Sequence, residues 1–383
     1  MTAALPNTAS IPAASWAISS IFFLNGAGIG LWAAHVPVVQ ARAGLDTGVL
    51  GLLLLTIAAG AMSAMPVTGW LTARFSTRKV TLCAGFIFAI MTALLTRSSE
   101  LLPLFLTAFG FGASNGAMDV AMNANASEVE TARGVPTMSS FHGFFSLGGL
   151  AGAALGGLLI GIGFGDGSGT LLTSIVTMAV FALVARHVLK VAAHADAASH
   201  FALPRGPALF LGLLALLCMA VEGALVDWSA LLLTERTGAS AASAALGYSA
   251  FSVAMAACRF AGDGLVLRYG AQRIMVVGGL AMLAGLALAA LSTVYALTAL
   301  GFALVGLGAA NVVPLIFGAA ARLPGMSAGG GLATAATVGY TGFLLGPVAI
   351  GWVASQTNIA IALGGLALAG LFIALNARVV REA

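Results

Sequence analysis

Acidic and imidazole side chains stand inside stretches of this sequence that are otherwise too apolar to lie in water. The residues of this kind are Asp119, His142, Glu222 and Asp227. A charged group at the centre of a bilayer costs roughly 2.5–3.5 kcal/mol on insertion scales, so such residues are rare and usually functional. Because these side chains bind and release protons, the sequence predicts a membrane protein that couples proton binding to another process.

Asp119 lies in a regularly spaced polar row. Asn115, Asp119 and Asn123 are four residues apart, so they lie close to one face of a helix, which must face protein or a water-filled cavity. His142 falls in the next span, and both groups are expected roughly 5–10 Å on the cytoplasmic side of the membrane midplane. A carboxylate beside an imidazole in a low dielectric is a proton-sharing pair. The alternative is that Asp119 only accepts hydrogen bonds from the two asparagines or from helix-capping amides.

Glu222 is the second candidate for proton binding, and it falls near the middle of its span. A lone carboxylate at that depth is suited to bind a proton, or an amine or hydroxyl group of a solute. Asp227 follows about 140° further round the helix, so the two carboxylates do not share a face. Asp227 and Trp228 lie nearer the outer end, where they are expected either to form part of a gate or to be solvated at the interface.

The composition indicates a multi-pass helical membrane protein. Hydrophobic residues make up 60% of the 383-residue chain and charged residues only 7%, whereas a soluble protein carries about a quarter charged residues. A spanning helix needs about 20 mostly apolar residues, and the alternating strand pattern of an outer-membrane barrel is absent. Segments that satisfy the helical requirement lie at residues 14–41, 47–72, 80–97, 102–125, 137–162, 169–189, 207–233, 242–261, 273–292, 295–321, 330–353 and 358–377.

The basic residues predict the orientation of these twelve spans. Thirteen Lys and Arg residues, Arg259 among them, fall on the side of the two chain termini, and Arg42, Arg97 and Arg236 fall on the other side. Basic residues are enriched on the cytoplasmic side, so we expect both termini in the cytoplasm and the protein in a bacterial inner membrane. The net charge of +4 follows from this topology, and no nucleic-acid partner is expected.

The chain divides into two halves of six spans that resemble each other. Four short matches recur in order, separated by 196, 197, 196 and 199 residues. One match pairs Asn25 with Glu222, and another pairs Asn115 with Asn311. Two parallel six-helix repeats are an arrangement found in membrane carriers. The predicted parts are an N-terminal half, a cytoplasmic linker and a C-terminal half, at residues 1–189, 190–206 and 207–383.

Over nearly its whole length the chain resembles the major facilitator superfamily. The cytoplasmic loop signature of that superfamily is present in weakened form at residues 69–79 (GWLTARFSTRK), and more clearly at residues 262–270 (GDGLVLRYG). The resemblance implies that these loops latch the cytoplasmic ends of the two halves together, with Arg74, Asp263 and Arg268 as gating residues. It also implies that the first, fourth, seventh and tenth spans line a central cavity.

A narrower resemblance is to the MosC-like branch of bacterial inner-membrane carriers, which is linked to rhizopine, an amino-inositol derivative. It rests on residues 118–125 (MDVAMNAN), 140–149 (SFHGFFSLGG) and 222–228 (EGALVDW). The residues expected to bind a hydroxyl-rich solute are Asn25, Asn115, Asn123, Glu222, Asn311 and Tyr340. For each polar residue alone, hydrogen bonding between helices is the alternative role.

Together these patterns predict a secondary transporter with an all-α fold of twelve transmembrane helices. Proton binding at Asp119, His142 and Glu222 is expected to drive a small sugar-, inositol- or amine-like solute across the membrane by alternating access. No nucleotide-binding loop, metal-ligand pattern or catalytic motif is visible, so we expect no enzymatic activity, no metal and no cofactor. The protein is expected to act as a monomer in the bilayer. The alternatives are a drug or metabolite exporter of the same superfamily, or a membrane sensor that does not transport.

Overall fold

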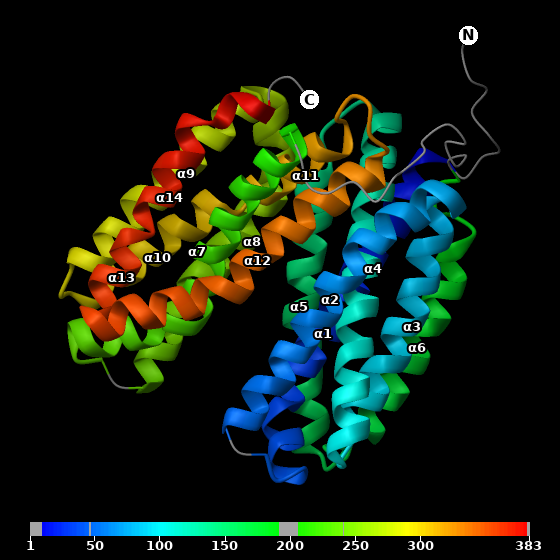
Figure 1. Ribbon diagram of the computed structural model, residues 1–383, viewed down its shortest axis with the longest axis horizontal. Helices are drawn as coiled ribbons and strands as arrows, with labels where there is room; N and C mark the ends of the chain where they lie inside the picture. Colours follow the sequence, from blue (N-terminus) through cyan, green and yellow to red (C-terminus); the bar gives the residue numbers. More distant parts are fainter. Residues whose placement is uncertain (1–9, 46, 191–205, 240, 381–383) are drawn as a thin grey trace. The chain divides into compact units, whose positions relative to one another are not determined.

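Helices make up all the secondary structure of the described residues. The structure is a computed structural model that describes residues 10–45, 47–190, 206–239 and 241–380. Figure 1 shows the helices in chain order, coloured from blue to red. They are α1 (Ile11–Arg42), α2 (Thr47–Phe75), α3 (Thr77–Arg97), α4 (Leu101–Arg133), α5 (Met138–Gly161), α6 (Ser168–Ala185), α7 (Gly206–Thr237), α8 (Ala241–Tyr269), α9 (Ala271–Leu291), α10 (Tyr295–Ala309), α11 (Val312–Ala321), α12 (Ala328–Gln356), α13 (Ile359–Gly365), α14 (Ala367–Leu375) and a final 3₁₀ turn (Ala377–Val380).

Eleven segments of the described chain are long and apolar enough to cross a membrane. One of them, Tyr295–Ala321, contains both α10 and α11, which are separated by Ala310 and Asn311. The twelfth expected span, at residues 358–377, is present as the short helices α13 and α14. Helices satisfy their own backbone hydrogen bonds, as a bilayer requires. The predicted all-α, multi-pass fold is therefore confirmed.

The end of α8 differs from the prediction. The apolar pattern predicted a span at residues 242–261 followed by a loop, but the helix continues to Tyr269. Gly262 instead lies inside the helix at a close contact, where an added Cβ would be 2.0 Å from the Asn311 side-chain oxygen. Small residues at such contacts are typical of membrane helices. As a result, Arg259 lies within the span and not at its cytoplasmic end, where the sequence had placed it.

The chain forms two compact units. Unit 1 takes in residues 1–134, 144–202 and 325–333, and unit 2 takes in residues 135–143, 203–324 and 334–383. The first residues of α5 therefore belong to unit 2, and the first residues of α12 belong to unit 1. The linker predicted at residues 190–206 lies almost wholly outside the described residues, so the predicted division of the chain stays a prediction.

Glycines bring helix backbones into direct contact at equivalent places in the two units. A Cβ on Gly148 of α5 would lie 2.0 Å from the Phe23 carbonyl oxygen of α1, and a Cβ on Gly342 of α12 would lie 2.2 Å from the Leu216 carbonyl oxygen of α7. A side chain larger than glycine at either position would clash with the facing backbone, so these glycines allow the close approach of the helices.

In each unit, an arginine at the end of one helix donates hydrogen bonds to the end of another helix. Arg42, at the end of α1, donates hydrogen bonds to the carbonyl oxygens of Thr96 and Ser98 at the end of α3. Arg236, at the end of α7, donates to the carbonyl oxygen of Ser292 just after α9, over 3.3 Å. Helix C-termini leave carbonyl groups without intrahelical donors, and a cation there also interacts favourably with the helix dipole.

Candidate functional site

The core of unit 2 contains a buried ion pair between α7 and α8. Glu222 Oε2 lies 3.6 Å from Arg259 Nη2, and the two residues are 9% and 7% exposed. Both side chains come from segments long and apolar enough to span a membrane. Charges in such a position are paired or face a polar cavity, because an isolated charge is costly there.

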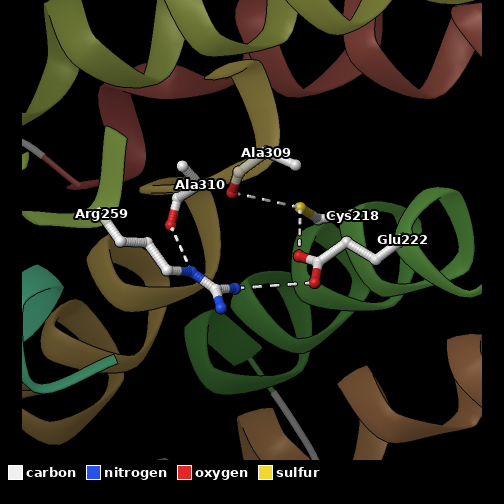
Figure 2. A network of polar contacts seen from close by, with 5 residues as sticks. All are labelled: Cys218, Glu222, Arg259, Ala309 and Ala310. Atoms are coloured by element: carbon white, nitrogen blue, oxygen red, sulfur yellow. Dashed lines mark hydrogen bonds and ion pairs between the residues drawn. The ribbon is translucent and has the colours of Figure 1, made fainter. Parts of the chain in front are cut away.

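Arg259 also forms a hydrogen bond to the break between α10 and α11. Arg259 Nε donates to the Ala310 carbonyl oxygen over 3.2 Å, as Figure 2 shows. In a continuous helix this carbonyl would accept from the residue four positions later, which is Pro314 and has no N–H group. The proline therefore leaves a carbonyl oxygen for the guanidinium group to satisfy.

Cys218 completes this network, one turn before Glu222 on α7. Its Sγ lies 3.6 Å from Glu222 Oε1 and 3.9 Å from the Ala309 carbonyl oxygen, at the last residue of α10 (Figure 2). The thiol is a weak donor, so these are weak contacts. The carboxylate of Glu222 thus faces a thiol with one oxygen and a guanidinium group with the other.

The chemistry of this pair is asymmetric. Glu222 can be neutralised by a proton, whereas an arginine side chain stays charged in proteins. Removing one partner of a buried pair costs about 3–5 kcal/mol, because the other charge is left uncompensated. Protonation of Glu222 therefore removes the negative charge of the pair, which is a way to link proton binding to the binding of a second species.

The polar row predicted on α4 lies inside unit 1. Asp119 is 6% exposed and Asn123 is fully buried. The Asn123 amide donates to Asp119 Oδ1 over 3.2 Å, and the Asn25 amide of α1 donates to Asn115 Oδ1 over 2.8 Å. The structure therefore brings four of the predicted residues together in two pairs.

His142 lies near the start of α5, in the part of that helix that belongs to unit 2. Its ring contacts the ring of Phe317 on α11, with centroids 6.3 Å apart, and it is close enough to Arg259 to interact electrostatically with it. Asp119 belongs to unit 1. The predicted pairing of Asp119 with His142 therefore stays a prediction.

Two further predicted binding residues lie in unit 2. Asn311 occupies the break before α11, where its amide reaches the Cys258 carbonyl oxygen over 3.4 Å. Tyr340, on α12, is half-buried and its ring lies 6.0 Å from that of Phe343. No described hydrogen bond joins either residue to Glu222, so their predicted role in binding a solute stays a prediction.

The predicted gating residues have separate surroundings. Asp263 accepts hydrogen bonds of 2.9 Å from the backbone N–H groups of Ser139 and Ser140, at the first turn of α5. A carboxylate there satisfies backbone donors and interacts favourably with the helix dipole. Among the other predicted gating residues, the guanidinium of Arg74 lies over the Trp70 and Phe75 rings, and that of Arg268 lies over the Tyr269 ring. Asp227 is exposed, and the ring of Trp228 faces Gly351.

Arg259 is the functional candidate that the sequence reasoning missed. The predicted end of the span at residue 261 placed it in the cytoplasm among the orientation signals. The residues after it carried a usable signal, since Leu265, Val266 and Leu267 continue the apolar pattern beyond Gly262. An arginine with apolar residues on both sides is typical of a buried functional position.

The fold and the ionisable groups in its core define a multi-pass helical membrane protein of the carrier type. The chain is 37% identical over 359 residues to an uncharacterized MFS-type transporter of Yersinia pestis, covering 94% of each chain. It is 33% identical over 367 residues to the membrane protein MosC of Rhizobium meliloti, covering 94% of this chain and 88% of that one. The chain therefore belongs to the major facilitator superfamily, and the predicted resemblance to MosC is confirmed. No family model matches it.

Solved structures agree with the fold. The Escherichia coli fucose:proton symporter FucP superposes with a TM-score of 0.77 at 16% identity, covering 96% of this chain and 98% of that chain. The proton:xylose symporter XylE superposes with a TM-score of 0.73 at 12% identity, covering 95% and 94% of the two chains. At these identities the likeness concerns the fold alone. The protein is thus a major-facilitator transporter, and its relatives and structural neighbours are transporters.

Proposed function

We propose that this protein is a proton-coupled secondary transporter that moves a small polar solute, sugar-, inositol- or amine-like, by alternating access. The observation that carries the proposal is the buried pair of Glu222 and Arg259 between two spanning helices. A purely structural bundle has no need of such a pair, since apolar residues of similar volume often serve stability equally well or better.

The proposed cycle uses the change of charge at Glu222. With Glu222 ionised, the pair with Arg259 is neutral and closed. Proton binding weakens the pair and opens the site to a solute, and release of both on the other side restores it. Asp119 and His142 are proposed as further proton-binding groups, and the energy source is the proton gradient with no bound cofactor.

The setting of the cycle is also a proposal. We place the protein in the bacterial inner membrane with both termini in the cytoplasm, as a monomer that transports rather than catalyses. FucP and XylE are proton symporters of fucose and xylose, and this supports proton coupling and a sugar-like solute for the present chain.

The test is uptake into proteoliposomes under an imposed pH gradient. Sugars, inositols and amines are first screened by thermal shift, because a ligand that binds the folded state raises its apparent stability. Uptake of a ligand found in this way should rise with an acidic exterior and disappear with a protonophore. Glu222→Gln should abolish gradient-driven accumulation, as should Asp119→Asn.

The control is Glu235→Gln, which removes an exposed carboxylate from the same helix, α7, and should leave uptake unchanged. Retained gradient-driven uptake in both Glu222→Gln and Asp119→Asn would refute the mechanism. Efflux of large apolar compounds in place of uptake would favour the exporter alternative, and binding without flux would favour a sensor.

A further inference from the structure

Exposed aromatic and basic side chains lie together where α2 turns into α3. Cζ of Arg74 lies 5.4 Å from the centroid of the Trp70 ring and 5.6 Å from that of the Phe75 ring. Trp70 is 40% exposed and Phe75 is 45% exposed, so neither ring is buried in the protein. Lys79 is exposed on the first turn of α3. These four residues form the α2–α3 corner.

The same arrangement recurs in the other unit, where α8 turns into α9. Cζ of Arg268 lies 5.2 Å from the centroid of the Tyr269 ring, which is 43% exposed. Arg273 is exposed on the first turn of α9. These three residues form the α8–α9 corner. Residues 74–79 (RFSTRK) and 268–273 (RYGAQR) thus share an arginine, an aromatic residue directly after it, and a basic residue at the sixth position.

The basic groups of both corners lack a counterion from the described part of the chain. The described ion pair joins other residues, and no described residue accepts a hydrogen bond from Arg74 or Arg268. The helices α2, α3 and α9 contain no acidic residue. The acidic residue of α8 is Asp263, and both of its carboxylate oxygens accept from backbone N–H groups of α5. The charge of each corner is therefore available to a group from outside the protein.

Stacking on a ring leaves the hydrogen-bonding edge of an arginine accessible. The ring covers the flat face of the guanidinium group, whereas the N–H donors point outward in its plane and match two phosphate oxygens. The segments that are able to span a membrane, Leu52–Phe75 and Ser249–Tyr269, end at the two corners. Aromatic residues at such ends are typical of the membrane–water interface. Each corner thus presents phosphate-binding donors at the level of lipid head groups.

Exposed apolar side chains continue from each corner along its helix. On α2, Val67 is exposed and precedes Trp70 and Arg74 by three and seven residues, so the three lie close to one face of the helix. On α8, Leu267 is exposed next to Arg268. A free phosphate ion would contact only the basic groups. A phospholipid would cover the apolar face with its acyl chains as well, which favours a lipid as the occupant.

From these observations we propose that each corner binds an anionic phospholipid, with the phosphate on the exposed basic side chains and the acyl chains along the exposed apolar face of α2 or α8. The proposal requires that the chain lie in a membrane, and it does not depend on proton coupling. Each basic residue beside an anionic head group favours binding about fivefold. Two such residues at a corner therefore predict a preference of about thirtyfold for phosphatidylglycerol over zwitterionic phosphatidylcholine.

The first test measures lipid retention by native mass spectrometry of the full-length protein. The protein is released from micelles that contain equal amounts of phosphatidylglycerol and phosphatidylcholine. Wild type should retain phosphatidylglycerol at two sites, and Arg74→Gln and Arg268→Gln should each weaken one of them about fivefold. The control is Arg186→Gln, which removes an exposed basic residue that lies over no described ring and should leave both sites intact. Equal retention by wild type and the Arg74→Gln/Arg268→Gln double variant would overturn the proposal, as would equal losses in Arg186→Gln and Arg74→Gln.

A second variant separates a stacked site from diffuse attraction between charges. Arg74→Lys keeps the positive charge but lacks the planar donors, so it should also weaken retention at one site, and full retention would overturn the stacked site.

Wild-type protein gives an independent reading if the variants fail to fold. Its apparent unfolding temperature in detergent should rise in a saturable manner with phosphatidylglycerol and not with phosphatidylcholine. No rise with phosphatidylglycerol would overturn the proposal. An equal rise with inorganic phosphate at the same concentration and ionic strength would overturn the assignment to a lipid.

Discussion

Replacing Ser76 with glycine should stabilise the protein, because Ser76 holds a backbone conformation that suits glycine. Ser76 joins α2 to α3 with φ 84° and ψ 147°. Among the described residues, it is the only non-glycine residue whose φ is positive. Gly270 joins α8 to α9 with φ 81° and ψ 149°. The two junctions therefore have the same geometry, but only one has the residue type that adopts it without strain.

The size of the effect follows from two opposing contributions. A non-glycine residue in this region costs about 1–3 kcal/mol, which the substitution would relieve. Glycine also gives the unfolded chain more freedom, which costs about 0.4–1 kcal/mol. The Ser76 side chain makes no capping hydrogen bond to α3, so the substitution breaks no such contact. The net expectation is a gain of about 1 kcal/mol, or about 1–3 °C in unfolding temperature for a chain of this length.

The assay is thermal unfolding in detergent at a fixed scan rate, since unfolding of such proteins is often irreversible. Ser76→Ala is the matched control, because it removes the hydroxyl group but keeps the Cβ and hence the strain. Gly270→Ser should cost about 1–3 kcal/mol by introducing the same strain in the other unit. The reasoning is refuted if Ser76→Ala stabilises as much as Ser76→Gly, or if Gly270→Ser is neutral.

Four further substitutions test contacts at helix ends. Arg42→Ala should lower the free energy of unfolding by about 1.5–3 kcal/mol. Arg236→Ala should lower it by less, because the hydrogen bonds of Arg236 are more exposed. Thermal unfolding measures both effects, and unchanged stability in both variants would contradict the capping role. Asp263→Asn keeps the shape but removes the charge from the α5 N-terminus, so apparent stability should fall by about 1–2 kcal/mol, and an unchanged unfolding temperature would argue against the dipole interaction. Hydrogen bonds from Ser168 lower the pKa of Asp166, so Asp166→Asn should be less stable than wild type above the ordinary Asp pKa, and the difference should vanish as pH falls through the lowered pKa; a difference that persists in acid would contradict this.

The fold was predictable because hydrophobic length alone determines which segments can cross a bilayer. The row on α4 was also predictable: four-residue spacing placed Asp119 and Asn123 on one face, and the structure joins them by a hydrogen bond. Local periodicity carries this information, since one turn of helix separates the two residues.

Other features depended on contacts between distant segments and could not be read from local patterns. Arg259 was misplaced because residues 262–270 resemble a loop signature, whereas the helix continues to Tyr269, with Gly262 packed against Asn311. Whether Asp119 meets His142 depends on both units, and it remains a prediction.

Pro314 has no backbone N–H group, and this has a consequence for the affinity of the site for a solute. Because the carbonyl of Ala310 accepts from Nε, the guanidinium plane stays anchored whatever its outer nitrogens face. A long side chain of this type otherwise loses about 2 kcal/mol of rotamer entropy when it is immobilised. Here the Arg259 side chain is ordered before any solute binds, so the binding site is preorganised. In Pro314→Ala, the Ala310 carbonyl could accept a hydrogen bond from the N–H group of residue 314. Arg259 would then be held less firmly, and solute binding should weaken although no residue in contact with the solute has changed.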